Sequence, residues 1–182
     1  MRIIGGRLNR RQIRPPAGLP VRPTTDKAKE ALFNILNNHI DFEAVRVLDL
    51  FSGTGSIAYE FASRNAIEVI AVDNNLRCTR FIKEVKGKYA LDNLTVLNAD
   101  ALRFLRNVST QFDIIFCDPP YEMKGIEEIP GLVFDGNLLL PNGFLILEHT
   151  DSVRVDNHPA FVFKRNYSKV HFSFFEAAGN AS

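Results

Sequence analysis

The 182-residue sequence has no tryptophan, only two cysteines and no long apolar run. A membrane-spanning helix needs about 20 apolar residues, so we expect no such helix and no membrane partner. Cys78 and Cys117 are too few for a disulfide framework, and the four histidines show no metal-ligand spacing, so we expect no metal site. The N-terminus lacks the apolar core of a signal peptide. Together with an ordinary apolar fraction of 46%, these absences predict a cytoplasmic globular protein.

The first 25 residues lack acidic residues and lysine, and they carry a charge of +6. The remaining 157 residues carry −5. The positive charges come from six arginines: Arg2, Arg7, Arg10, Arg11, Arg14 and Arg22. A basic segment on a mildly acidic body predicts one place where a polyanion such as nucleic acid binds. We therefore expect residues 1–23 to form a basic arm or hairpin and residues 24–182 to form a single globular domain. Arginine-rich termini can also serve solubility alone, and the composition leaves that alternative open.

Apolar strands alternate with helical segments from residue 45 onward. The predicted parallel strands are Val45–Leu50, Glu68–Val72, Leu94–Leu97, Phe112–Cys117 and Phe144–Glu148. The predicted helices are one that Thr24-Thr25-Asp26 caps, then Gly55–Arg64, Asn75–Lys88, Asp100–Arg106 and part of Glu127–Leu138. The segments Phe161–Arg165 and Lys169–Phe175 are predicted to pair as a hairpin. This alternation is typical of an α/β fold with a mostly parallel sheet, to which the hairpin adds an antiparallel edge. Glu148-His149 is expected at a surface strand end.

Asp118-Pro119-Pro120-Tyr121 directly follows an apolar strand. Adjacent prolines cannot donate hydrogen bonds to a sheet, so the strand ends there. In open α/β sheets the carboxyl ends of strands form the ligand-binding edge. A carboxylate (Asp118), a carbonyl (Pro119) and an aromatic ring (Tyr121) suit a planar group with N–H donors, such as the exocyclic amine of a nucleobase. The same residues also form turns without a ligand, so the motif needs support from elsewhere.

The first predicted strand runs into a glycine-containing loop. Gly53 and Gly55, with Ala58 after them, match the dinucleotide pattern G-x-G-x-x-G/A, and Asp73 ends the next strand. Asp49 stands ahead of the glycines, where it would repel a pyrophosphate and attract a cationic or amino group. The chain also lacks a second half-domain for a nicotinamide and its substrate. The loop therefore favours another nucleoside ligand.

Carboxylates end three successive strands, at Asp49, Asp73 and Asp100. Asp73 could accept hydrogen bonds from ribose hydroxyls. Asp100 could accept from an adenine amine, to whose ring the amide of Ala101 could donate. Each carboxylate could instead be a helix N-cap, but three in succession favour one nucleoside lying across the sheet edge.

The order of these motifs resembles that of the S-adenosylmethionine-dependent methyltransferases with an Asp-Pro-Pro-Tyr motif. Three segments resemble more closely the bacterial RsmD family, the guanine-N2 methyltransferases of 16S ribosomal RNA: Ile3-Ile4-Gly5-Gly6-Arg7, Arg22-Pro23-Thr24-Thr25-Asp26 and Leu32-Phe33-Asn34. The resemblance covers nearly the whole chain. Ala58 departs from it where many members have glycine, and Asn74 departs where a more acidic stretch is common.

The resemblance implies a Rossmann-like class I methyltransferase fold with a seven-stranded sheet. It also implies S-adenosylmethionine as cofactor and one guanine of 16S rRNA, in an assembled or partly assembled 30S particle, as substrate. We expect a monomer without an obligate protein partner.

The motifs and the resemblance together predict three groups of site residues. The predicted catalytic residues are Asp118, Pro119 and Tyr121. The predicted cofactor contacts are Asp49, Phe51, Gly53, Gly55, Asp73, Asn74, Asp100, Ala101 and Asp118. The predicted RNA contacts are Arg2, Arg7, Arg10, Arg11, Arg22 and Tyr121.

Three alternatives remain at this point. An adenine-N6 methyltransferase of DNA or RNA would use the same tetrapeptide. A nicotinamide-dependent oxidoreductase would share the glycine loop but would not explain Asp118–Tyr121. A non-catalytic RNA-binding module would explain the arginines but not the three strand-end carboxylates.

Overall fold

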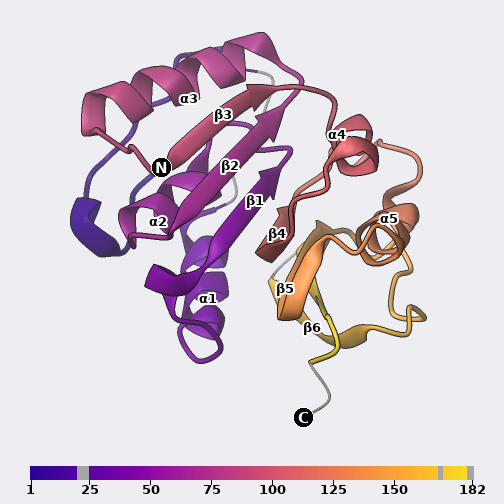
Figure 1. Cartoon of the computed structure of the whole chain (residues 1–182). Helices are drawn as coiled ribbons and strands as arrows, with labels where there is room; N and C mark the ends of the chain where they lie inside the picture. Colours follow the sequence, from indigo (N-terminus) through magenta and orange to yellow (C-terminus); the bar gives the residue numbers. More distant parts are fainter. Residues whose placement is uncertain (20–24, 168–169, 180–182) are drawn as a thin grey trace.

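A seven-stranded sheet with the order β3-β2-β1-β4-β5-β7-β6 forms the centre of the computed structural model, which describes residues 1–19, 25–167 and 170–179 (Figure 1). The strands are β1 (Arg46–Leu50), β2 (Glu68–Asp73), β3 (Leu94–Asn98), β4 (Phe112–Cys117), β5 (Leu139–His149), β6 (Phe161–Tyr167) and β7 (Val170–Glu176). Strands β1 to β5 pair in parallel, whereas β7 is antiparallel to both β5 and β6. The predicted α/β fold with an antiparallel C-terminal hairpin is thus confirmed. Arg22, Thr24 and Lys169 lie outside the described residues.

Helices cover both faces of the sheet. They are α1 (Asp26–Leu36), α2 (Ser56–Ser63), α3 (Leu76–Tyr89), α4 (Ala101–Asn107) and α5 (Ile129–Asp135), with short 3-10 turns at Gly6–Leu8, Phe42–Ala44 and Ile126–Glu128. Helices α1 to α3 contribute to one apolar cluster, and α4 and α5 to the other. Neighbouring strand residues alternate between the clusters, as Ile114 and Ile115 do, because successive side chains of a strand point to opposite faces. Within the described ranges, no helix has both the length and the apolar character needed to cross a bilayer.

The basic N-terminal segment forms a hairpin that packs on the first face of the sheet. Arg2 pairs with Gln12 in an antiparallel bridge, and Ile3, Leu8 and Ile13 are buried in the core cluster of α1 to α3. Gly6 has φ +69°, and a Cβ there would overlap the backbone of Ser63 in α2. Whereas these apolar side chains are buried, the arginines of the hairpin are exposed: Arg2, Arg7, Arg10, Arg11 and Arg14.

Strand β5 begins earlier than the sequence predicts. Its bounds include Asn142-Gly143, which we expected as a turn before the strand. Asn142 has a left-handed φ of +61°, and the pairing register shifts between Phe112 and Ile114 of the neighbouring β4. A Cβ on Gly143 would lie 2.9 Å from the Asp113 carbonyl. The turn residues are therefore accommodated as an irregularity within a longer strand.

Candidate active site

The loop between β1 and α2 turns sharply at the carboxyl edge of the sheet. Phe51, Gly53 and Gly55 all have left-handed φ values, of 58°, 52° and 79°. A Cβ on Gly55 would lie 2.8 Å from the ring of Tyr59, so both the backbone and the packing of α2 require glycine there. Phe51 adopts the same region as a non-glycine residue, which is a strained conformation typical of ligand sites.

Asp49 holds this loop from inside the sheet. Its carboxylate is 1% exposed, and Oδ2 accepts a hydrogen bond of 3.1 Å from the amide of Ala58 in the first turn of α2. Gly55 stands at the N-cap and has no side chain to do this, so Asp49 caps the helix from β1. Burial raises the pKa of Asp49 well above its usual value. The hydrogen bond from the Ala58 amide lowers this pKa, whereas the negative charges of Asp118 and Asp73 raise it further.

Asp73 ties the end of β2 to the same loop. Its Oδ2 accepts from the amide of Gly53 at 2.8 Å, and its Oδ1 accepts from the amide of Asn75 at 2.7 Å. Burial raises the pKa of Asp73, while these two amide hydrogen bonds lower it. Each carboxylate oxygen can accept more than one hydrogen bond. The contacts to the loop thus leave acceptor capacity for ligand hydroxyls.

Asp100 is the N-cap of α4. Its Oδ1 accepts from the amide of Arg103 at 2.8 Å, which is the structural role that the sequence left open beside a ligand contact. Its carboxylate is exposed at the end of β3, as is Asn74 at the end of β2, whereas Ala101 is buried as the first residue of α4. The exposed positions border the same carboxyl edge of the sheet.

The Asp118–Tyr121 motif follows β4 immediately, beside the glycine loop. The Asp118 amide donates to the carbonyl of Leu50 at 3.5 Å, and the Met123 amide donates to Pro120 at 2.9 Å, which closes a turn. Asp118 and Tyr121 are half-buried and Pro119 is buried. Because Asp118 contributes to the raised pKa of Asp49, these two carboxylates lie within electrostatic range of each other. The structure thus brings the glycine loop, Asp73 and the tetrapeptide together.

Among the predicted arginine contacts that the structure describes, Arg2, Arg7, Arg10 and Arg11 lie on the hairpin rather than in this loop cluster. Arg7 donates from its guanidinium to the carbonyl of Ala90, at the C-terminal end of α3. Helix α3 begins next to Asp73. Its C-terminal end, where Arg7 binds, therefore lies away from Asp73. Arg7 therefore helps to fasten the hairpin onto α3.

Sequence reasoning missed a buried polar group next to the tetrapeptide. Glu148 and His149 are 3% and 2% exposed rather than on the surface, because β7 pairs along the whole end of β5. The His149 ring lies 2.8 Å from Ser173 Oγ through Nε2 and 2.8 Å from the Thr150 carbonyl through Nδ1. Burial lowers the pKa of His149. The polar pair at the end of an otherwise apolar strand was the only signal in the sequence.

A buried ion pair under the hairpin was also missed. Lys29 Nζ lies 3.0 Å from Glu60 Oε1, and both side chains are almost fully buried. The same ammonium donates to the Arg2 carbonyl at 2.6 Å and to Ser56 Oγ at 3.1 Å. Glu60 also accepts from the Ile4 amide at 2.8 Å. The pair therefore joins α1, α2 and the hairpin.

Comparison with known proteins places the chain in a family. The family described as "Conserved hypothetical protein 95" matches residues 1–176. The chain belongs to this family. Ribosomal RNA small subunit methyltransferase D of Haemophilus influenzae is 32% identical over 152 residues, which cover 81% of this chain and 78% of that protein. The Escherichia coli protein of the same name is 30% identical over 148 residues, covering 81% and 74%. The resemblance to the RsmD family is therefore confirmed.

Solved structures agree with this assignment. The Escherichia coli protein yhhF superposes with a TM-score of 0.85 at 26% identity, over 99% of both chains. The predicted class I methyltransferase fold is confirmed.

Proposed function

We propose that this chain transfers a methyl group from S-adenosylmethionine to the exocyclic N2 amine of one guanine in 16S ribosomal RNA. As a member of the RsmD family it is an S-adenosylmethionine-dependent methyltransferase of ribosomal RNA. The observation that carries the finer proposal is the meeting of Asp118–Tyr121 with the Asp49 and Asp73 carboxylates at one sheet edge. We further propose that the protein acts as a monomer, in the cytoplasm, on assembled or partly assembled 30S particles.

The residues at this edge fit a cationic nucleoside. S-adenosylmethionine supplies an electrophilic methyl group on a positively charged sulfonium. The mutual repulsion of Asp49, Asp73 and Asp118 is relieved by a positive charge and worsened by a pyrophosphate, which argues against a nicotinamide dinucleotide. Asp73 would hold the ribose, and Asp100 with the Ala101 amide would hold the adenine. The walls of the cofactor site would be completed by Phe51, Gly53, Gly55 and Asn74.

Asp118 and Pro119 would orient the guanine amine. This amine is a poor nucleophile because its lone pair is delocalised into the ring. When the Asp118 carboxylate and the Pro119 carbonyl each accept one N–H, the direction of the lone pair is fixed, which is mainly an orientation effect with electrostatic help. The Tyr121 ring would stack on the extruded base, an interaction worth about 1–3 kcal/mol per base in single-strand binding.

The proposed reaction is tested by incubating the protein with tritiated S-adenosylmethionine and hypomethylated small ribosomal subunits, followed by mass spectrometry of the nucleosides. Label in N2-methylguanosine is the expected result. Label in N6-methyladenosine would show that the target base is adenine and not guanine. RNA binding without any label would show that the protein is a non-catalytic RNA-binding module.

Substitution of Asp73 by alanine is expected to weaken S-adenosylmethionine binding about 10- to 100-fold in calorimetry. The variant loses the ribose acceptor and also the bonds to the Gly53 and Asn75 amides, and hydrogen bonds to a charged group contribute about 1.5–3 kcal/mol. The turnover rate at saturating cofactor should change less, because ribose contacts are largely uniform binding. Asp92→Ala, at an exposed aspartate before β3, is the matched control. An unchanged affinity in Asp73→Ala would remove Asp73 from the cofactor site.

Replacing Arg10 and Arg11 by glutamine is expected to weaken RNA binding and its dependence on salt. Both side chains are exposed on the hairpin, and each phosphate contact that is lost lowers the slope of log K against log salt by about 0.7–0.9. Filter binding at several salt concentrations measures the slope. A slope equal to that of the wild type would assign these arginines to solubility.

A further inference from the structure

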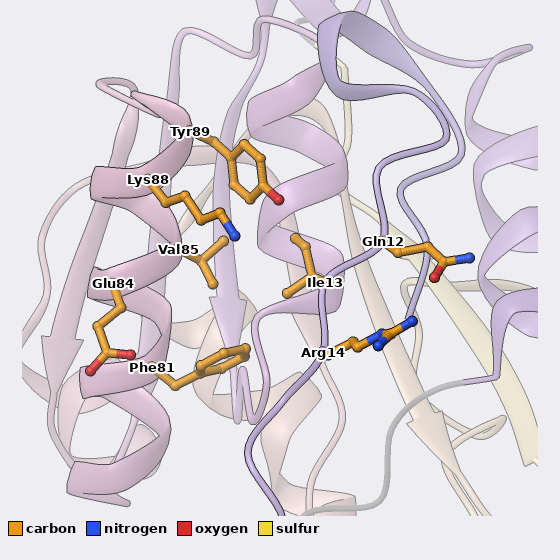
Figure 2. A pocket seen from close by; sticks show the side chains of 8 residues that line it. All are labelled: Gln12, Ile13, Arg14, Phe81, Glu84, Val85, Lys88 and Tyr89. Atoms are coloured by element: carbon orange, nitrogen blue, oxygen red, sulfur yellow. The ribbon is translucent and has the colours of Figure 1, made fainter.

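A groove separates the N-terminal hairpin from α3. It encloses about 310 Å³ and lies between residues 12–14 on one wall and residues 81–89 on the other (Figure 2). Its floor is apolar, because Ile13, Phe81 and Val85 meet there and are 4%, 8% and 5% exposed. The rim carries longer side chains from both walls. The groove therefore combines an apolar base with edges that can contact a solvated partner.

The two segments that form the groove are strongly basic, and its rim carries Arg14 and Lys88 against the single carboxylate of Glu84. Residues 1–19 hold five arginines and no acidic residue, and α3 holds five cationic residues and one glutamate. These two segments carry +9 in a chain whose total is +1, so that the rest carries −8. In Figure 2 the Lys88 ammonium points from α3 toward Ile13, and the Arg14 guanidinium lies on the opposite wall, whereas the Glu84 carboxylate points away from the hairpin. The field over the groove is therefore positive.

The chain that follows the groove wall runs toward the candidate active site. Residues 12–14 lie against the C-terminal half of α3, and further along the chain a Cβ on Gly18 would lie 3.9 Å from Nη2 of Arg77, in the first turn of that helix. The segment therefore follows α3 back toward its N-terminus, over a helix of 14 residues, or about 21 Å. That N-terminus follows Asp73 directly. A chain lying along α3 would thus reach the cofactor edge of the sheet.

We propose that this groove is an RNA-binding site, in which Arg14 and Lys88 on its rim, together with Arg77 beyond it on α3, hold the phosphates of the 16S rRNA strand that enters the active site. The proposal rests on the proposed function for the identity of the RNA. Three exposed cations along one path match the repeated charge of a phosphate backbone, and the apolar floor accommodates the less polar faces of ribose or base. Contacts to phosphate position the strand without selecting its sequence. The groove thereby extends the basic surface from the hairpin arginines to the sheet edge.

The test compares two double variants that remove the same charge. Arg14→Gln with Lys88→Gln changes the groove, and Arg106→Gln with Lys164→Gln changes exposed cations on α4 and β6. Binding to protein-free hypomethylated 16S rRNA is measured without cofactor by filter binding over a range of salt. The groove variant should bind about tenfold more weakly near 0.15 M salt, with a slope lower by about 1.5, the value for two lost phosphate contacts. Its KM for RNA should rise, while kcat and S-adenosylmethionine affinity stay at wild-type values.

Equal affinity and slope in the two double variants would overturn the proposal. A loss confined to assembled 30S particles, with protein-free rRNA bound normally, would also overturn it, because the groove would then contact a ribosomal protein. Failure of the wild-type protein to methylate RNA would overturn the proposed function instead. The binding comparison remains decisive in that case, since it involves no methyl transfer.

Discussion

Substitution of Asp118 by alanine is expected to lower methyl transfer by about a thousandfold while S-adenosylmethionine still binds within about tenfold of wild type. The carboxylate is the proposed acceptor of one amine N–H, and the loss of such an orienting, charge-stabilising group commonly has effects of about this size. The cofactor loop should persist, because the bonds that hold it come from Asp49 and Asp73. Single-turnover assays with hypomethylated subunits measure the rate, and calorimetry measures the affinity.

Two further variants sharpen this experiment. Asp118→Asn keeps one acceptor oxygen and should retain more activity than Asp118→Ala. Asp135→Ala removes an exposed aspartate at the end of α5 and should leave the rate unchanged. Full activity in Asp118→Ala would refute the role of this residue in the reaction.

Substitution of Lys29 by alanine is expected to destabilise the fold by about 3–5 kcal/mol, the usual effect of removing one partner of a buried ion pair. Glu60 would keep its buried carboxylate next to the Ile4 amide but would lose the ammonium at 3.0 Å. Burial already raises the pKa of Glu60, and Lys29 is the largest influence that lowers it. Urea unfolding followed by circular dichroism measures the change.

The double variant Lys29→Met with Glu60→Leu separates charge from packing. Replacing both members of a buried pair by apolar residues of similar volume is often nearly neutral, so this variant should be clearly more stable than Lys29→Ala. A Lys29→Ala protein within about 1 kcal/mol of wild type would show that water reaches the pair and stabilises Glu60 on its own.

The sequence predicted which candidate residues share one sheet edge better than it predicted the contacts that support them. Asp49, Asp73 and Asp118 could be placed at one edge because parallel strands align their carboxyl ends, whatever the details of packing. The backbone bonds of Asp49 and Asp73 to the glycine loop could not be foreseen, because they depend on how the loop folds back onto the strands. Asp100 proved to be the helix cap that its spacing allowed.

The residues that were missed share a dependence on distant partners. Lys29 stands next to the apolar residues of α1, and nothing local indicates that Glu60 and the hairpin will cover it. His149 is buried only because β7 lies beside β5. Arg7 belongs to a basic segment, yet its guanidinium contacts the Ala90 carbonyl. In each case the local sequence pattern predicts the secondary-structure element. The exposure of its side chains depends on which other elements pack against it in the fold.

The position of α2 has a practical consequence for protein engineering. Its first turn holds the glycine loop through Ala58 and Asp49, and its last residue, Ser63, accepts from the Leu8 amide and donates to the Gly5 carbonyl of the hairpin. The two attachments, at Ala58 and Ser63, lie five residues apart along the helix, a rise of roughly 7.5 Å. Because a helix is stiff, a substitution that shifts the hairpin therefore tilts α2 and displaces the glycine loop that its first turn holds. Libraries aimed at altered RNA preference should thus be screened for cofactor retention in parallel.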